Sequence, residues 1–123
     1  MSEATDQMAL IEFCERFSGR VPELARVVHV PNGEKRDKAT AGKLKAMGVR
    51  RGVPDLLLPV ARTPFHGLWV ELKTTKGKLS ADQVEWLTYL NEAGYLAYVA
   101  YQWTDAAAFI LDYLGCDPKE YGL

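Results

Sequence analysis

The chain has 123 residues, 48% of them hydrophobic and 25% charged, and a formal net charge of −1, which is an ordinary composition for a single soluble globular domain. Its two cysteines, Cys14 and Cys116, have no further ligands at metal-binding spacing, which excludes a disulfide scaffold and a zinc finger and indicates a reducing compartment. No apolar run approaches the roughly 18 residues of a membrane span, and the N-terminus lacks the basic start of a signal peptide, so we expect a cytoplasmic domain with no membrane contact.

The first half of the chain predicts a helix, a strand and a second helix. Ser2 is a suitable helix N-cap, and apolar residues follow it at helical spacing: Met8, Ile11, Cys14 and Phe17. Residues 25–30 are rich in valine and end at the turn 31–33, which predicts a strand. Residues 37–47 alternate lysine with alanine and leucine at helical period and stop near Gly48, which predicts the second helix.

The second half predicts two strands, a helix, a last strand and a last helix. Pro54 introduces the continuous apolar run 55–58, which is typical of a strand buried on both faces, and residues 67–73 form the next strand. The helix 80–93 ends at Gly94, a common C-terminal stop. Residues 95–101 form the last strand, and Thr104 opens a helix that runs through Tyr113. Helices between most of the strands predict an α/β domain around a small sheet.

Basic residues are concentrated in the middle of the chain. Residues 35–78 hold eleven of the fifteen lysines and arginines but only three acids, a net charge of +8, whereas the remaining residues carry −9. A local basic excess is typical of a surface that binds a polyanion such as nucleic acid. Solvated loops and helix faces would produce the same count, so charge alone leaves both interpretations open.

Three charged residues in two neighbouring predicted strands point to chemistry. Asp55 begins one strand, and Glu71 and Lys73 lie on one face of the next, because side chains alternate along a strand. An exposed ion pair would explain Glu71 and Lys73 by themselves. Adjacent antiparallel strands are about 5 Å apart, so Asp55 and Glu71 can converge on one point and would then need a cation. Hard oxygen ligands favour Mg²⁺ or Mn²⁺, and a lysine beside that ion suits an attacking water or a phosphate oxygen.

These residues carry a resemblance to a known family. Pro54–Asp55 and the later Glu71–Leu72–Lys73 resemble the PD-(D/E)XK phosphodiesterase core, and further segments narrow it: 31–33 with Arg36, 48–55, 66–68 and 77–83. Together they resemble the VRR-NUC family, the virus-type replication-repair nucleases, over nearly the whole chain. The resemblance implies a metal-dependent nuclease in one domain, residues 1–123, with a restriction-endonuclease-like α-β-α-β-β-α-β-α core and a mixed central sheet flanked by helices.

The resemblance also implies roles for individual residues. Asp55, Glu71 and the backbone carbonyl of Leu72 would be ligands of Mg²⁺ or Mn²⁺, and Lys73 would orient or deprotonate the attacking water. Gln83 matches a glutamine that some relatives use to hold water at the metal. The segment 80–83 is also a capping box, which is enough to explain Gln83 structurally. The two roles are compatible.

The first-helix acid of the family matches Glu3, with Gln7 on the same helical face one turn later. An acid beside a helix N-terminus is also favourable by itself, so a purely local role stays open. Glu12 is the competing candidate, but it lies between Ile11 and Phe13, and we expect it to face solvent.

Six residues are candidate DNA contacts: Asn32, Arg36, Arg50, Arg51, Lys76 and Lys78. Asn32, Gly33 and Arg36 would form a phosphate-contacting turn, although Asn–Gly also marks an ordinary turn. Lys76 and Lys78 follow the predicted catalytic strand and would contact the DNA backbone, although exposed loop lysines are common. We expect structural roles for His66 and the three tryptophans, and no role for His29.

The leading hypothesis is a structure-selective DNA endonuclease, because short stand-alone members resemble phage-encoded Holliday-junction resolvases that act as homodimers. A two-fold dimer would place two active sites on two strands of a junction. Aromatic residues of the C-terminal third would supply the dimer interface, unless they form a local core: Tyr95, Tyr98, Tyr101, Trp103, Phe109 and Tyr113. The alternatives are a flap or nicking nuclease and a non-catalytic nucleic-acid-binding module on the same scaffold.

Overall fold

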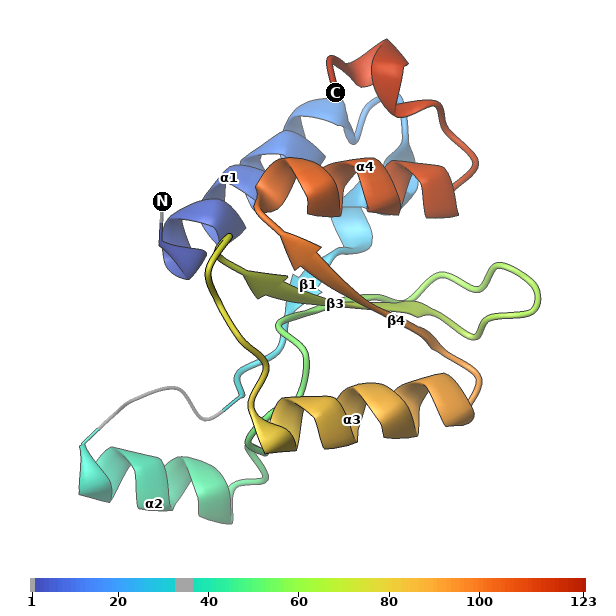
Figure 1. The fold of residues 1–123 in the computed structure, drawn as a ribbon. Coiled ribbons are helices and arrows are strands. Elements are labelled where there is room, and N and C mark those ends of the chain that lie inside the picture. The colour runs from blue at the N-terminus through green and yellow to red at the C-terminus, as the bar shows by residue number, and fades with distance from the viewer. Residues whose placement is uncertain (1, 33–36) are drawn as a thin grey trace.

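The sheet has four strands of mixed direction. The computed structural model of the protein describes residues 2–32 and 37–123 (Figure 1). The strands lie side by side in the order β1 (Val28–His29), β2 (Leu56–Leu58), β3 (Leu68–Lys73) and β4 (Leu96–Tyr101). β1 and β2 are antiparallel, as are β2 and β3, whereas β3 and β4 are parallel. The predicted α/β class with a mixed central sheet is therefore confirmed.

Helices cover both faces of this sheet. α1 (Glu3–Phe17) and α4 (Trp103–Tyr113) lie together on one face, and α3 (Ala81–Glu92) lies on the other (Figure 1). α3 also forms the crossover that joins the parallel strands β3 and β4. α2 (Lys38–Ala46) stands apart from these layers. None of the helices in residues 2–32 and 37–123 combines the length and apolarity needed to cross a membrane.

β3 separates the apolar core from a polar site. Its residues Leu68, Val70 and Leu72 belong to the main core, which they share with residues of α1 and α4. Because side chains alternate along a strand, Glu71 and Lys73 point to the opposite face, and both are nevertheless buried. β3 thus contributes three apolar residues to the core on one face and presents two charged residues on the other.

Two predicted elements differ at their boundaries. The strand expected over 25–30 is reduced to β1, and a 3₁₀ helix, η1 (Pro22–Arg26), precedes it. Pro22 opens η1, where its fixed φ suits a helical turn. α4 begins at Trp103, one residue before the expected Thr104, because Gln102 redirects the chain with a φ of 78°. A second 3₁₀ helix, η2 (Pro118–Tyr121), follows α4 and was not expected.

The aromatic residues of the C-terminal third mostly fill the chain's own core. Tyr98 stacks on Phe109 with ring centroids 3.6 Å apart, and both pack against the core, as do Trp103 and Tyr113. Tyr95 packs edge-on against the Trp69 ring. Of the six aromatics expected at a dimer interface, Tyr101 alone is well exposed, at 44%. These contacts support the local-core alternative, and an interface formed by this group stays a prediction.

Candidate active site

Asp55 stands where the hydrogen-bond ladder between β2 and β3 is interrupted. The register pairs Leu56 with Val70, so the next pair along is Pro54 and Leu72. Proline has no N–H to donate, and the Leu72 N–H donates to Asp55 Oδ2 at 2.8 Å. The N–H and C=O of a strand residue face the same neighbour. The Leu72 carbonyl therefore faces the side of Asp55 and receives no hydrogen bond from Pro54.

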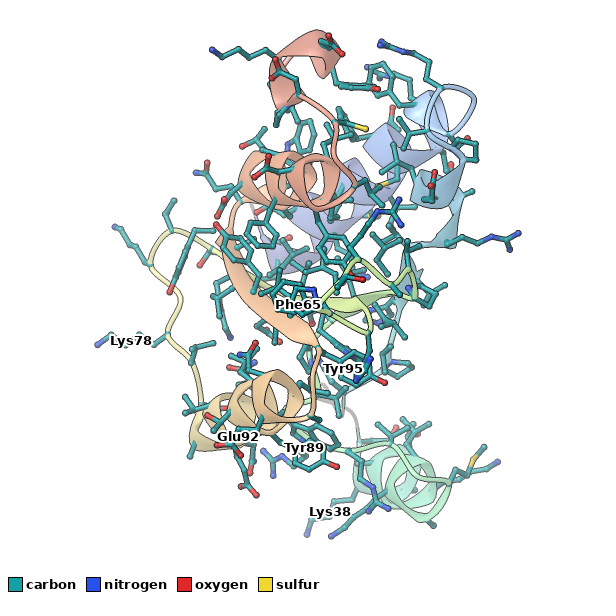
Figure 2. The ribbon with its side chains drawn as sticks, turned by 90° about the vertical axis from the view of Figure 1, so that its right-hand side faces the viewer. Lys38, Phe65, Lys78, Tyr89, Glu92 and Tyr95 are labelled. Atoms are coloured by element: carbon teal, nitrogen blue, oxygen red, sulfur yellow. The ribbon has the colours of Figure 1, made fainter. Side chains whose placement is uncertain are left out.

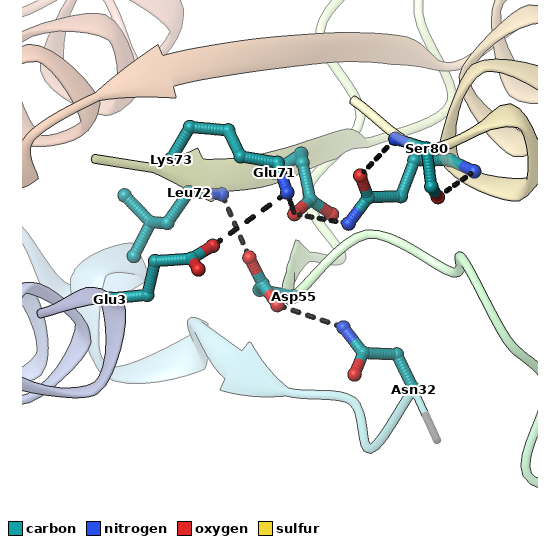
Figure 3. Close-up of polar contacts among 8 residues, drawn as sticks. Glu3, Asn32, Asp55, Glu71, Leu72, Lys73 and Ser80 are labelled. Atoms are coloured by element: carbon teal, nitrogen blue, oxygen red, sulfur yellow. Dashed lines mark hydrogen bonds and ion pairs between the residues drawn. The ribbon is translucent and has the colours of Figure 1, made fainter. Parts of the chain in front are cut away.

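Three carboxylates converge beside this interruption (Figure 3). One oxygen each of Glu3, Asp55 and Glu71 lies within 4.8 Å of the others. Glu71 is 1% exposed, and within the described residues its Oε1 has no hydrogen-bond partner. Burial, followed by the neighbouring Asp55 carboxylate, raises the pKa of Glu71 to about 9. A cation at this point would relieve both the repulsion and the missing hydrogen bond.

Lys73 provides positive charge at the edge of the cluster. Its Nζ lies 3.9 Å from Glu71 Oε2 and 3.8 Å from Glu3 Oε1 (Figure 3). Glu3 reaches it from the first turn of α1. Glu12, the competing candidate, is solvent-exposed and pairs with Arg16 along the same helix. Of the two candidate acids, Glu3 is the one that lies at the cluster.

Gln83 joins the cluster to the start of α3. Its Nε2 donates to Glu71 Oε2 at 3.2 Å, and its Oε1 accepts from the Ser80 N–H at 2.8 Å (Figure 3). Ser80 Oγ in turn accepts from the Gln83 N–H, which completes a capping box. The amide therefore caps α3 with its oxygen and orients Glu71 with its nitrogen, so the capping role leaves Gln83 in contact with the cluster.

The cluster lines an open cavity of about 640 Å³. A close approach between two segments shapes its rim. Gly52 has a φ of 86°, and a Cβ at this position would lie 2.5 Å from the Asp82 carbonyl carbon. The turn before β2 can pack this tightly on α3 because residue 52 is glycine. Arg51, which precedes it, is thereby held at the cavity.

The model of the VRR-NUC domain matches residues 28–103, more than half of the chain. The chain belongs to the VRR-NUC family. A solved structure named "VRR_NUC domain protein" is 30% identical in sequence and superposes with a TM-score of 0.79, covering 95% of this chain and 91% of that one. No curated protein matches the chain. Family membership implies a nuclease-type function, with nucleic acid as the substrate.

The residues of this VRR-NUC site fit a divalent cation. The carboxylates of Glu3, Asp55 and Glu71 are hard oxygen donors of the kind that Mg²⁺ and Mn²⁺ prefer. Glu71 Oε1 has no hydrogen-bond partner among the described residues, and the Leu72 carbonyl, which no ladder bond from Pro54 occupies, is one further acceptor at this point. Asp55, Glu71 and the Leu72 carbonyl could therefore hold the ion.

The predicted DNA contacts are distributed unevenly around the cavity. Asn32 lines it and donates through Nδ2 to Asp55 Oδ1 at 2.9 Å, so this side chain orients the carboxylate. Arg51 also lines it. The other described candidates are exposed and lie outside the lining: Arg50, Lys76 and Lys78. Figure 2 shows Lys78 extending outward from its loop. Gly33 and Arg36 lie outside the described residues.

Two residues without a predicted role make polar contacts, His29 at the cavity and Asp6 where α1 packs against α4. His29 lines the cavity, and its Nδ1 lies 2.9 Å from the Asp55 carbonyl oxygen, which can only accept, so Nδ1 carries a proton. Asp6 is buried and accepts from the Trp103 N–H at 3.2 Å, which joins the first turn of α1 to the start of α4. Asp6 lies on the same helical face as the apolar residues Leu10 and Phe13. An acid on a face that otherwise packs in the core was the signal in the sequence for its buried position. The contact of His29 with the Asp55 carbonyl depends on the pairing of β1 with β2, which no local pattern in the sequence indicates.

Proposed function

We propose that the protein is a Mg²⁺- or Mn²⁺-dependent endodeoxyribonuclease that hydrolyses phosphodiester bonds in branched DNA. The observation that carries this proposal is the convergence of three carboxylates within 4.8 Å, with the Lys73 ammonium 3.9 Å from Glu71, at an open cavity. Two carboxylates and a lysine beside a cation form an arrangement suited to attack on a phosphate by water. A role in nucleic-acid binding alone would require neither the buried Glu71 nor its crowding against Asp55.

The residues of the site divide the chemistry among them. Asp55, Glu71 and the Leu72 carbonyl would hold the ion, which supplies Lewis acidity and neutralises phosphate charge when bound. Lys73 can donate from its ammonium to the attacking water or to a phosphate oxygen, because its Nζ is held at the cluster by two carboxylates. Gln83 and Asn32 hold Glu71 and Asp55 in orientation. Glu3 restrains Lys73 from the opposite side.

The substrate that we propose is a four-way junction, resolved by a homodimer. The described residues of each chain offer one such cluster, and paired incision of two strands requires two, which a two-fold dimer would supply. Arg51 at the cavity edge supports binding of a phosphate backbone.

The test compares labelled substrates of matched sequence: a four-way junction, a flap, a nicked duplex and a linear duplex. We expect paired incision of the junction with Mg²⁺ or Mn²⁺ and none in excess EDTA, with the circular dichroism spectrum unchanged. The same assay on Glu71→Gln should show no cleavage. Glu12→Gln is its matched control, since Glu12 is a solvent-exposed acid outside the cluster.

Each outcome has a clear consequence. Cleavage that persists in EDTA would refute metal dependence. Preference for the flap or nick, together with a monomeric mass by light scattering at micromolar concentration, would replace the junction resolvase with a flap or nicking nuclease. Binding without cleavage of any substrate would leave a non-catalytic module.

A further inference from the structure

α2 is the helix that contributes least to the fold. None of its residues is buried, and Leu44 is its single half-buried residue. Met47, which caps it, is 71% exposed. Figure 1 shows the helix set apart from the sheet and its covering helices, and Figure 2 shows Lys38 at the outer edge of the molecule. A helix of nine residues is marginal in water by itself, so this element is suited to packing against another molecule.

The charge of the segment identifies the kind of molecule. Residues 38–54 contain no acid and five basic residues: Lys38, Lys43, Lys45, Arg50 and Arg51. A net charge of +5 over 17 consecutive residues complements a polyanion. The segment is also continuous with the site, because Arg51 at its C-terminal end lines the cavity.

One face of α2 combines two lysines with small residues between them. Lys38 and Lys45 are seven positions apart, which places them about 20° apart around the helix and about 10 Å apart along it. Ala41 and Gly42 lie between them on this face, and a Cβ at Gly42 would meet no atom within 4 Å. A phosphate backbone can therefore approach closely between the lysines. Lys43 points about 140° away from Lys38.

We propose that the Lys38–Lys45 face of α2 binds the phosphate backbone of a duplex arm of the DNA whose scissile phosphate occupies the cavity. This inference rests on the proposed function. The five residue steps from Ala46 to Arg51 span at most about 17 Å, and the helix adds about 14 Å. At 3.4 Å per base pair, the contact would lie within roughly nine base pairs of the cleaved bond.

The test measures DNA binding of Lys38→Ala/Lys45→Ala as a function of salt, on substrates whose duplex arms have 4 or 14 base pairs. Each phosphate contact contributes about 0.9 to the slope of log affinity against log salt, so we expect the slope to fall by about 1.8 on long arms. Affinity near 0.15 M salt should fall roughly 30-fold. Alanine favours helix, so α2 should persist, which circular dichroism checks.

Two further variants make the result specific to one face. Lys43→Ala removes one charge from the same helix, half of what the double alanine variant removes, and should change the slope by less than about 0.5, whereas Lys38→Arg/Lys45→Arg should retain the wild-type slope. Wild-type protein should bind long arms more tightly than short arms, and the double alanine variant should lose this gain.

A change of slope per charge removed that is the same for Lys43→Ala as for the double alanine variant would overturn the inference, because it would show only the general positive charge of the segment. A dependence on arm length that survives in the double alanine variant would also overturn it while leaving the nuclease proposal intact. A fall in affinity that coincides with a halved mass by light scattering would assign α2 to a second copy of the chain. Wild-type protein that neither binds nor cleaves DNA would overturn the proposed function and this inference with it.

Discussion

Replacement of Glu71 by glutamine should stabilise the metal-free protein while abolishing its activity. Burial and the neighbouring Asp55 carboxylate together raise the pKa of Glu71 from its ordinary value of 4.5 to about 9. Between these two values the folded chain holds a proton on Glu71 that the unfolded chain has released. The free energy of unfolding therefore falls as the pH rises through this range. Glutamine has nearly the same volume, can still accept from Gln83, and does not titrate.

The size of the effect follows from the difference between the two pKa values. Each pH unit within the window costs the wild-type protein about 1.4 kcal/mol, so the loss between pH 5.5 and 7.5 is about 3 kcal/mol. Glu71→Gln lacks this loss, and its stability relative to wild type should rise by about that amount over the same interval. Titrating groups that do not contact Glu71 are common to both proteins and cancel in the comparison.

The measurement is urea unfolding followed by tryptophan fluorescence, in EDTA, at pH 5.5, 6.5 and 7.5. Glu12→Gln should track the wild-type curve, since Glu12 is exposed to solvent. Adding Mg²⁺ at 100 times its dissociation constant should stabilise the wild-type protein by about 3 kcal/mol but not Glu71→Gln. A stability difference that stays constant with pH, or a Glu71→Gln protein less stable than wild type at pH 7.5 in EDTA, would refute the reasoning.

Three further predictions concern the site and its surroundings. Asp55→Asn should lower the cleavage rate by orders of magnitude while DNA binding measured by fluorescence anisotropy persists; near-wild-type cleavage would move the metal site elsewhere. Lys76→Ala combined with Lys78→Ala should reduce the salt slope of binding by up to about 2 if both lysines contact phosphates, and an unchanged slope would assign the contacts to other residues. Asp6→Ala should cost about 1–3 kcal/mol in urea unfolding, because the Trp103 N–H at the start of α4 loses its acceptor, and an unchanged midpoint would show that this bond is dispensable.

Local patterns in the sequence predict the elements because short-range physics determines them. The apolar run of β2, the alternation in β3 and the capping box at Ser80 each depend on neighbours within a few residues, and all three recur in the structure. The strand expected over 25–30 is shorter in the structure. Pro22 opens a helical turn before it, and the extent of an edge strand depends on its partner strand.

The candidate site was predictable in its strand residues and less so elsewhere. Asp55, Glu71 and Lys73 are identified by the period of two along a strand and the spacing of adjacent strands. Asp6 was readable in principle, as an acid on an apolar helical stripe. The contact of His29 with the Asp55 carbonyl was not, because it depends on which strand β1 pairs with.

The sequence by itself determined the order of elements, the charged residues of β3 and the basic middle of the chain, since these follow from residue identity and local periodicity. Only the tertiary structure decided that Glu3 rather than Glu12 joins the cluster, that Gln83 contacts Glu71, and that most of the C-terminal aromatics pack against the core. It also leaves every residue of α2 unburied among the residues that the structure describes. These outcomes depend on the packing of helices on particular faces of the sheet, which brings together residues 12 to 70 positions apart in the chain. Such long-range proximity has no local signature in the sequence.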